Sequence, residues 1–117
     1  MRRVVVTGMG LLTPLGCGVE HVWERLLKGE SSATKITRFD TSDYSTGYAC
    51  EIPFGDVSQG KFNPDDWMSS KDRRKVDDFI LYGICAADQA VRDAGWSPDK
   101  EEDLLKTGVM IGSGIGG

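Results

Sequence analysis

The chain has 117 residues and a formal net charge of −4, with 39% hydrophobic and 27% charged residues. These values are ordinary for one soluble globular domain, and the acidic balance argues against general nucleic-acid binding, which needs a clearly basic surface. No apolar run approaches the roughly 20 residues that cross a bilayer, and the apolar residues 4–6 are too few for a signal peptide. The sequence therefore predicts a cytoplasmic protein without a membrane partner.

The front of the chain predicts a strand, a loop and an amphipathic helix. Residues 4–6 are consecutive valines, a β-branched run that suits a buried strand. The glycine-punctuated stretch at 7–18 predicts a loop. From Val19 to Leu27 apolar side chains recur at helical spacing, and Gly29 offers the residue that commonly ends a helix.

Residues 30–67 are predicted to form an irregular excursion. The stretch is rich in Ser, Thr, Asp, Gly and Pro, and it carries one plausible short strand near residues 48–52. Because it holds too few apolar residues for a core of its own, we expect an excursion within one domain rather than a second domain.

The strongest helical pattern follows the excursion. Ser69 and Asp72 have the spacing of a capping box, and apolar residues then recur every three or four positions as far as Ala94. Gly95 offers a stop. The apolar face is nearly unbroken, so the pattern predicts a central, tightly packed helix.

The last part of the chain predicts a short helix and a second buried strand. Ser97 and Pro98 supply an N-cap and a first helical residue, and residues 107–111 are the predicted strand. The order strand, helix, excursion, helix and strand indicates an α/β fold with a layered sheet. Two strands are too few for a self-sufficient sheet.

Two glycine-rich loops are candidates for phosphate binding. Gly8-Met9-Gly10 begins like a dinucleotide fingerprint, but Thr13 stands where a third Gly or Ala is needed. The stretch GSGIGG at 112–117 matches G-x-G-x-x-G, with no helix visible after it. Tight turns are favoured for both, and a small nucleotide-binding module using either loop stays open as an alternative.

Cysteine and histidine usage gives no candidate catalytic or metal centre. Cys17, Cys50 and Cys85 form neither an even disulfide set nor a C-x-x-C pair, and His21 is the only histidine. Reduced thiols are therefore expected. Cys85 has no local base or cation to activate it and is predicted to pack as a small hydrophobic residue. We expect His21 to lie partly exposed on the surface.

A basic cluster, KDRRK, opens the predicted long helix. Lys71, Arg74 and Lys75 fall at i, i+3 and i+4, so they are expected to share a face. One interpretation is a landing site for an acidic partner. The other is ordinary helix-surface solvation, with i,i+4 pairs between the arginines and Asp77 and Asp78. Charge alone leaves both open.

Four segments in register resemble the type II β-ketoacyl-acyl-carrier-protein synthases, condensing enzymes of bacterial fatty-acid synthesis. The resemblance covers almost the whole chain and is weakest over 54–67. It rests on RRVVVTGMGLLTPLG, LLKGESSATKITRFDTSDY, KDRRKVDDFILYGICAADQAVRDAG and GVMIGSGIGG.

The resemblance implies a thiolase-like αβαβα sandwich, of which residues 1–117 supply an incomplete first part of the N-terminal half. The parent would be a homodimeric 3-oxoacyl-[acyl-carrier-protein] synthase, which elongates an acyl thioester by decarboxylative Claisen condensation with malonyl-acyl carrier protein. No metal or organic cofactor is implied. Because the family's catalytic cysteine, histidines and lysine lie beyond the final glycine-rich turn, we expect these residues alone to be inactive and the ending to be a truncation.

Position within the family implies two roles. Lys71, Arg74 and Lys75 match the basic patch that docks the acidic helix of acyl carrier protein. Ile115 matches an isoleucine that projects into the acyl-chain pocket close to the dimer interface. A non-catalytic carrier-protein-binding domain, complete at this length, is a second alternative.

Overall fold

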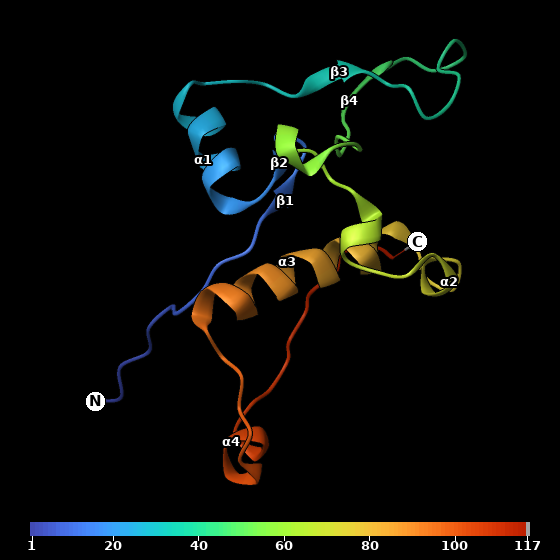
Figure 1. The fold of residues 1–117 in the computed structure, drawn as a ribbon. Coiled ribbons are helices and arrows are strands. Elements are labelled where there is room, and N and C mark those ends of the chain that lie inside the picture. Colours follow the sequence, from blue (N-terminus) through green and yellow to red (C-terminus); the bar gives the residue numbers. More distant parts are fainter. Residues whose placement is uncertain (117) are drawn as a thin grey trace. The chain divides into compact units, whose positions relative to one another are not determined.

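The computed structural model describes residues 1–116, which form two compact units (Figure 1). The hairpin unit is Leu11–Pro64. The helix unit combines Met1–Gly10 with the described part of Asp65–Gly117. Few hydrophobic side chains are buried in either unit. They are Leu15, Val22 and Phe62 in the hairpin unit, and Leu81 and Cys85 in the helix unit.

The hairpin unit opens with a tight hairpin and a helix. β1 (Leu12–Thr13) pairs antiparallel with β2 (Gly16–Cys17) inside the predicted loop. The helix α1 (Val19–Leu27) follows at once and confirms the predicted one. It buries Val22, and it ends where Gly29 adopts a left-handed φ of 67°.

A second hairpin occupies the predicted excursion. β3 (Ala33–Lys35) pairs antiparallel with β4 (Tyr48–Cys50), with Thr34 opposite Ala49. The strand expected near residues 48–52 is therefore confirmed. Its partner carries only a three-residue pattern, which is too short to be recognised by alternation.

Short 3₁₀ turns follow the second hairpin, η1 (Val57–Gln59) and η2 (Pro64–Asp66). Between them Phe62 is completely buried, and its ring meets that of Phe54 edge-on with centroids 5.4 Å apart. This aromatic pair gives the excursion a local apolar contact.

The long helix predicted to run from Ser69 to Ala94 is two helices. α2 (Ser70–Arg73) is a single turn capped by the Ser69 hydroxyl, and four residues separate it from α3 (Asp78–Ala94). The break occurs because the chain becomes extended at Asp77, where ψ is 160°, and helix then starts again. Asp77 is the N-cap residue of α3, and its side chain makes no capping hydrogen bond.

Both predicted buried strands are wrong for this structure. Residues 4–6 and 107–111 are extended coil, and the valines of the first segment are 75–95% exposed. A strand needs a neighbour's N–H and C=O groups, and within residues 1–116 neither segment pairs with another strand. The short helix α4 (Glu101–Leu105) also starts later than predicted, after Lys100.

The expectation that the long helix would be tightly packed is met only in part. On α3 just Leu81 and Cys85 are buried. The other large apolar side chains of this helix keep 38–50% of their surface exposed, because the helix unit covers a limited part of its face. They are Phe79, Ile80, Ile84 and Val91.

Candidate functional site

The first glycine loop packs against α3 (Figure 1). A Cβ added at Gly10 would lie 2.7 Å from Cβ of Gln89 and 2.9 Å from the backbone nitrogen of Ala90. The Met9 N–H donates to the Asp93 carboxylate at 2.9 Å. This geometry favours a close-packed turn over a phosphate cradle, because the amide between the two glycines already serves a carboxylate.

The second glycine loop is described as far as residue 116. Gly112 and Gly114 lie in coil, and Gly117, the last glycine of the predicted G-x-G-x-x-G pattern, lies outside the described residues.

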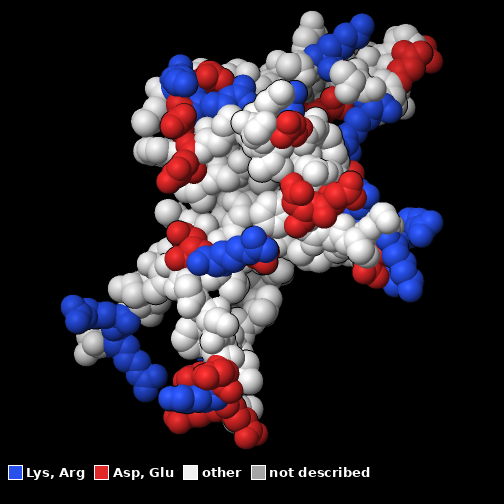
Figure 2. All heavy atoms as spheres, viewed as in Figure 1, with Lys and Arg blue, Asp and Glu red and all other residues white. Residues whose placement is uncertain are grey.

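The three predicted docking residues lie around the end of α2. Lys71 is in this turn, Arg74 caps its C-terminus and Lys75 follows, and all three are exposed. Because α2 ends at Arg73, they do not share one continuous helical face, and that expectation is wrong. In Figure 2 basic side chains nevertheless project into solvent at the α2 corner, on the right.

Local carboxylates divide the basic cluster into bound and free charges. Arg73 pairs with Asp65 at 2.6 Å, not with Asp77 four residues on, and Lys75 pairs with Asp72 at 2.9 Å. Among residues 1–116 no carboxylate forms an ion pair with the other two basic side chains, Lys71 and Arg74. These two therefore carry the cluster's available charge.

Asp72 fixes both the start of α2 and the position of Lys75. Hydrogen bonds from the Lys75 ammonium and from the Ser69 hydroxyl lower the pKa of its carboxyl below the usual value. The Ser69 hydroxyl also accepts the Asp72 N–H at 3.2 Å, which is the first half of the predicted capping box. Local side-chain contacts thus position the basic residues.

Ile115 lies at a cavity of about 480 Å³ in the helix unit, and its own side chain is 92% exposed. The opposite wall is the start of α3 and the residues just before it. The cavity's larger lining side chains are Val76, Asp77, Asp78, Phe79 and Tyr82.

A second, more apolar cavity of about 390 Å³ adjoins the first. Phe79 and Tyr82 line both cavities. The remaining large side chains of the second are Ile80, Ile84 and Ile111. Sequence analysis did not single out these aromatic residues, although their spacing of three on a helix already placed them on one face.

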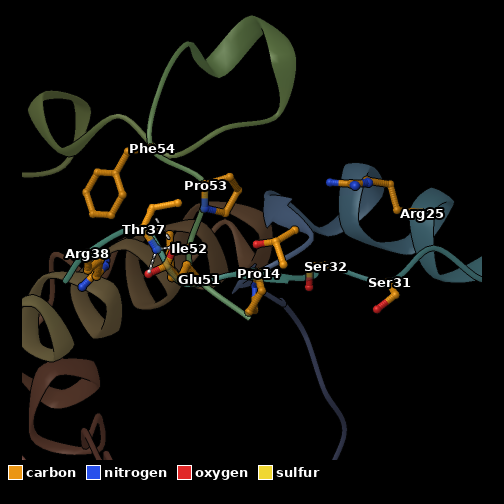
Figure 3. Close-up of a pocket in the computed structure, with 11 residues that line it drawn as sticks. Pro14, Arg25, Ser31, Ser32, Thr37, Arg38, Glu51, Ile52, Pro53 and Phe54 are labelled. Atoms are coloured by element: carbon orange, nitrogen blue, oxygen red, sulfur yellow. Dashed lines mark hydrogen bonds between the residues drawn. The ribbon is translucent and has the colours of Figure 1, made fainter. Parts of the chain in front are cut away.

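A third cavity, of about 530 Å³, lies in the hairpin unit (Figure 3). Its charged side chains are satisfied locally. Arg25 donates to the Leu15 carbonyl at 2.5 Å, and Glu51 accepts from the Thr37 hydroxyl at 2.8 Å, which lowers the pKa of the Glu51 carboxyl. Arg38 lies over the Phe54 ring. These contacts point to a structural role for the charges.

The three cysteines and the histidine differ in how far they are buried. Cys85 is fully buried and accepts a hydrogen bond from the Gln89 amide at 3.3 Å, so its predicted packing role is confirmed. Cys50 is exposed, and Cys17 and His21 are partly exposed. Among residues 1–116 no group of His, Cys, Asp and Glu side chains could hold a metal ion, and no helix there could span a membrane.

Comparison with known proteins identifies the family. The model of the β-ketoacyl synthase N-terminal domain matches residues 1–117, and the chain belongs to this family. The solved structure of the ishigamide ketosynthase/chain length factor is similar, with a TM-score of 0.69 and 38% identity over 82% of this chain and 22% of that one. The predicted fold class, part of a thiolase-like α/β sandwich, is thereby confirmed.

Several similar proteins are named 3-oxoacyl-[acyl-carrier-protein] synthase 2. The Rhizobium meliloti (strain 1021) protein is 58% identical over 100% of this chain, which covers 28% of that protein. The Vibrio cholerae protein is 48% identical over 99% of the chain and 26% of its own length. A mitochondrial 3-oxoacyl-[acyl-carrier-protein] synthase of Arabidopsis thaliana is 44% identical. The chain thus spans little more than a quarter of these relatives.

Proposed function

We propose that residues 1–117 are the N-terminal portion of a ketoacyl synthase domain in a 3-oxoacyl-[acyl-carrier-protein] synthase, with residues 30–67 as an excursion within that domain. The observation that carries this proposal is the 58% identity to the Rhizobium meliloti synthase along the entire chain. By resemblance, the full enzyme would act in the cytoplasm as a homodimer, without a metal or an organic cofactor.

The proposed chemistry is decarboxylative condensation. A cysteine thiolate elsewhere in the enzyme takes the acyl group from its carrier thioester and releases the carrier thiol. Malonyl-acyl carrier protein loses CO₂, and the resulting carbanion attacks the enzyme thioester. A carbon–carbon bond forms, the cysteine thiolate leaves, and a 3-oxoacyl carrier is the product. Residues 1–117 contribute recognition to this reaction and no catalytic residue.

Carrier recognition is assigned to Lys71, Arg74 and Lys75. Their exposure around α2 supports a docking role, since a basic surface attracts an acidic protein over long range. Pairing with Asp72 already offsets part of the Lys75 charge. We expect Lys71 and Arg74 to make the larger contributions.

Ile115 is assigned to the wall of the acyl cavity. Its side chain borders the cavity of about 480 Å³ whose other side is the start of α3. A bulkier side chain there would occupy space that the end of an acyl chain needs. The length of the acyl group is therefore the property that this residue would control.

Ile115→Phe in the full-length enzyme should shorten the preferred acyl donor while leaving condensation intact. The measurement is mass spectrometry of 3-oxoacyl products formed from malonyl-acyl carrier protein and acyl donors of graded length. Ile115→Val, which removes one methyl group, is the matched control and should not shorten the profile. Absence of 3-oxoacyl product with the unmodified enzyme would refute the proposed reaction, and an unchanged profile in Ile115→Phe would refute only the role of Ile115.

A further inference from the structure

We infer that Phe79 is a specificity-determining residue that forms the end wall of the acyl cavity, with Tyr82 beside it. The inference rests on the proposed function, because it takes the cavity at Ile115 to hold the acyl chain. Its structural basis is that Phe79 and Tyr82 are the side chains shared by two neighbouring cavities. They stand between a space bordered by Ile115 and a more apolar space behind it.

The Phe79 ring packs against the loop that carries Ile115. Its backbone is in the first turn of α3. The ring edge lies against the backbone of Gly116, where an added Cβ would be 3.2 Å from the Phe79 Cζ and 3.4 Å from its Cε1. Gly116 follows Ile115 directly, so the loop that carries Ile115 and the aromatic ring pack on one another.

Tyr82 extends the same wall by one helical turn. Its hydroxyl donates to the Asp78 carboxylate at 3.3 Å, which ties the ring to the start of α3. Phe79 and Tyr82 are three residues apart and therefore adjacent on the helix surface. Both side chains line both cavities, so we take the two together as the aromatic barrier between them.

The two cavities differ in the chemistry they offer. Asp77 and Asp78 border the first cavity, so one of its sides is acidic. The second is bordered by Ile80, Ile84 and Ile111 and has almost no polar surface. An alkyl chain that passed the aromatic barrier would gain an apolar environment of about 390 Å³. Removing part of the barrier should therefore favour longer acyl chains.

The test is the chain-length preference of Phe79→Leu in the full-length enzyme. We expect the ratio of kcat/KM for long-chain over medium-chain acyl donors to rise by roughly tenfold, the discrimination that a change of a methylene or two in an apolar pocket provides. Phe79→Ala should widen the shift, and Phe79→Leu keeps the test valid if the alanine variant fails to fold. A general loss of structure would lower both kcat/KM values and leave their ratio unchanged.

Val91→Ala is the matched control, since Val91 is an exposed apolar residue of the same helix that lines neither cavity, and it should leave the ratio unaltered. Ile115→Phe, measured in parallel, separates the two claims. If Ile115→Phe shortens the profile while Phe79→Leu and Phe79→Ala leave it unchanged, the barrier is refuted and the acyl cavity stands. If Ile115→Phe has no effect but the Phe79 variants lengthen the profile, the barrier stands and the role of Ile115 is refuted. If neither position moves the profile, both assignments are wrong.

Discussion

Replacing Lys71, Arg74 and Lys75 together by glutamate should weaken binding of acyl carrier protein to the full-length enzyme by more than about tenfold at low salt, or about 1.4 kcal/mol. All three side chains are exposed, and two of them have no carboxylate partner among residues 1–116. Reversal turns long-range attraction for an acidic protein into repulsion. A binding titration measures the change, which salt should diminish because ions screen exposed charges.

The matched control is glutamate at three exposed lysines elsewhere in the chain, Lys28, Lys35 and Lys100, which alters the net charge by the same amount. This variant should bind the carrier protein with much smaller loss. Equal weakening by both variants would mean that net charge alone governs binding, and undiminished affinity in the first variant would remove the docking assignment.

Gly10→Ala should destabilise the protein by about 1–3 kcal/mol, the range expected for overpacking a close contact. The added methyl group would meet the backbone of α3 at Ala86 and Ala90, which cannot turn aside as a side-chain end could. Denaturant unfolding of the full-length protein measures the loss. The same variant also tests the nucleotide-binding alternative. A loss of stability would show that the first glycine loop packs against α3.

Gly108→Ala is the comparison for Gly10→Ala, because no atom lies within 4 Å of an added Cβ at this position. It should change the free energy of unfolding far less. A Gly10→Ala protein as stable as the unmodified one would show that the loop does not pack tightly on α3. Saturable binding of NAD or ATP that Gly10→Ala abolishes would instead support a nucleotide site.

Local patterns predicted the elements whose determinants are local. α1 carries its apolar spacing and its Gly29 stop within the same short stretch, and Ser69 caps α2 as its spacing with Asp72 indicated. Strands depend on partners elsewhere, so the valine run at 4–6 was assigned by composition and is not a strand here. The break at Asp77 escaped prediction because the apolar periodicity runs through it without interruption.

In the candidate site, too, the sequence predicted local properties and missed contacts between distant residues. The exposure of Lys71, Arg74 and Lys75 follows from their charge, and sequence analysis anticipated it. Which cation is neutralised depends on neighbours brought close by turns, and an i,i+4 rule assigned the Arg73 partner to the wrong aspartate. The contact between Phe79 and the Ile115 loop joins segments more than thirty positions apart, so no local sequence pattern predicts it.

We propose that residues 1–117 recognise the carrier and the acyl chain, while the reacting thiol lies elsewhere in the enzyme. Incubating the full-length enzyme with an acyl carrier thioester, digesting it and locating the acyl group by peptide mass spectrometry tests this directly. We predict the acyl group on a cysteine outside residues 1–117. An acyl thioester on Cys17, Cys50 or Cys85 would contradict the account.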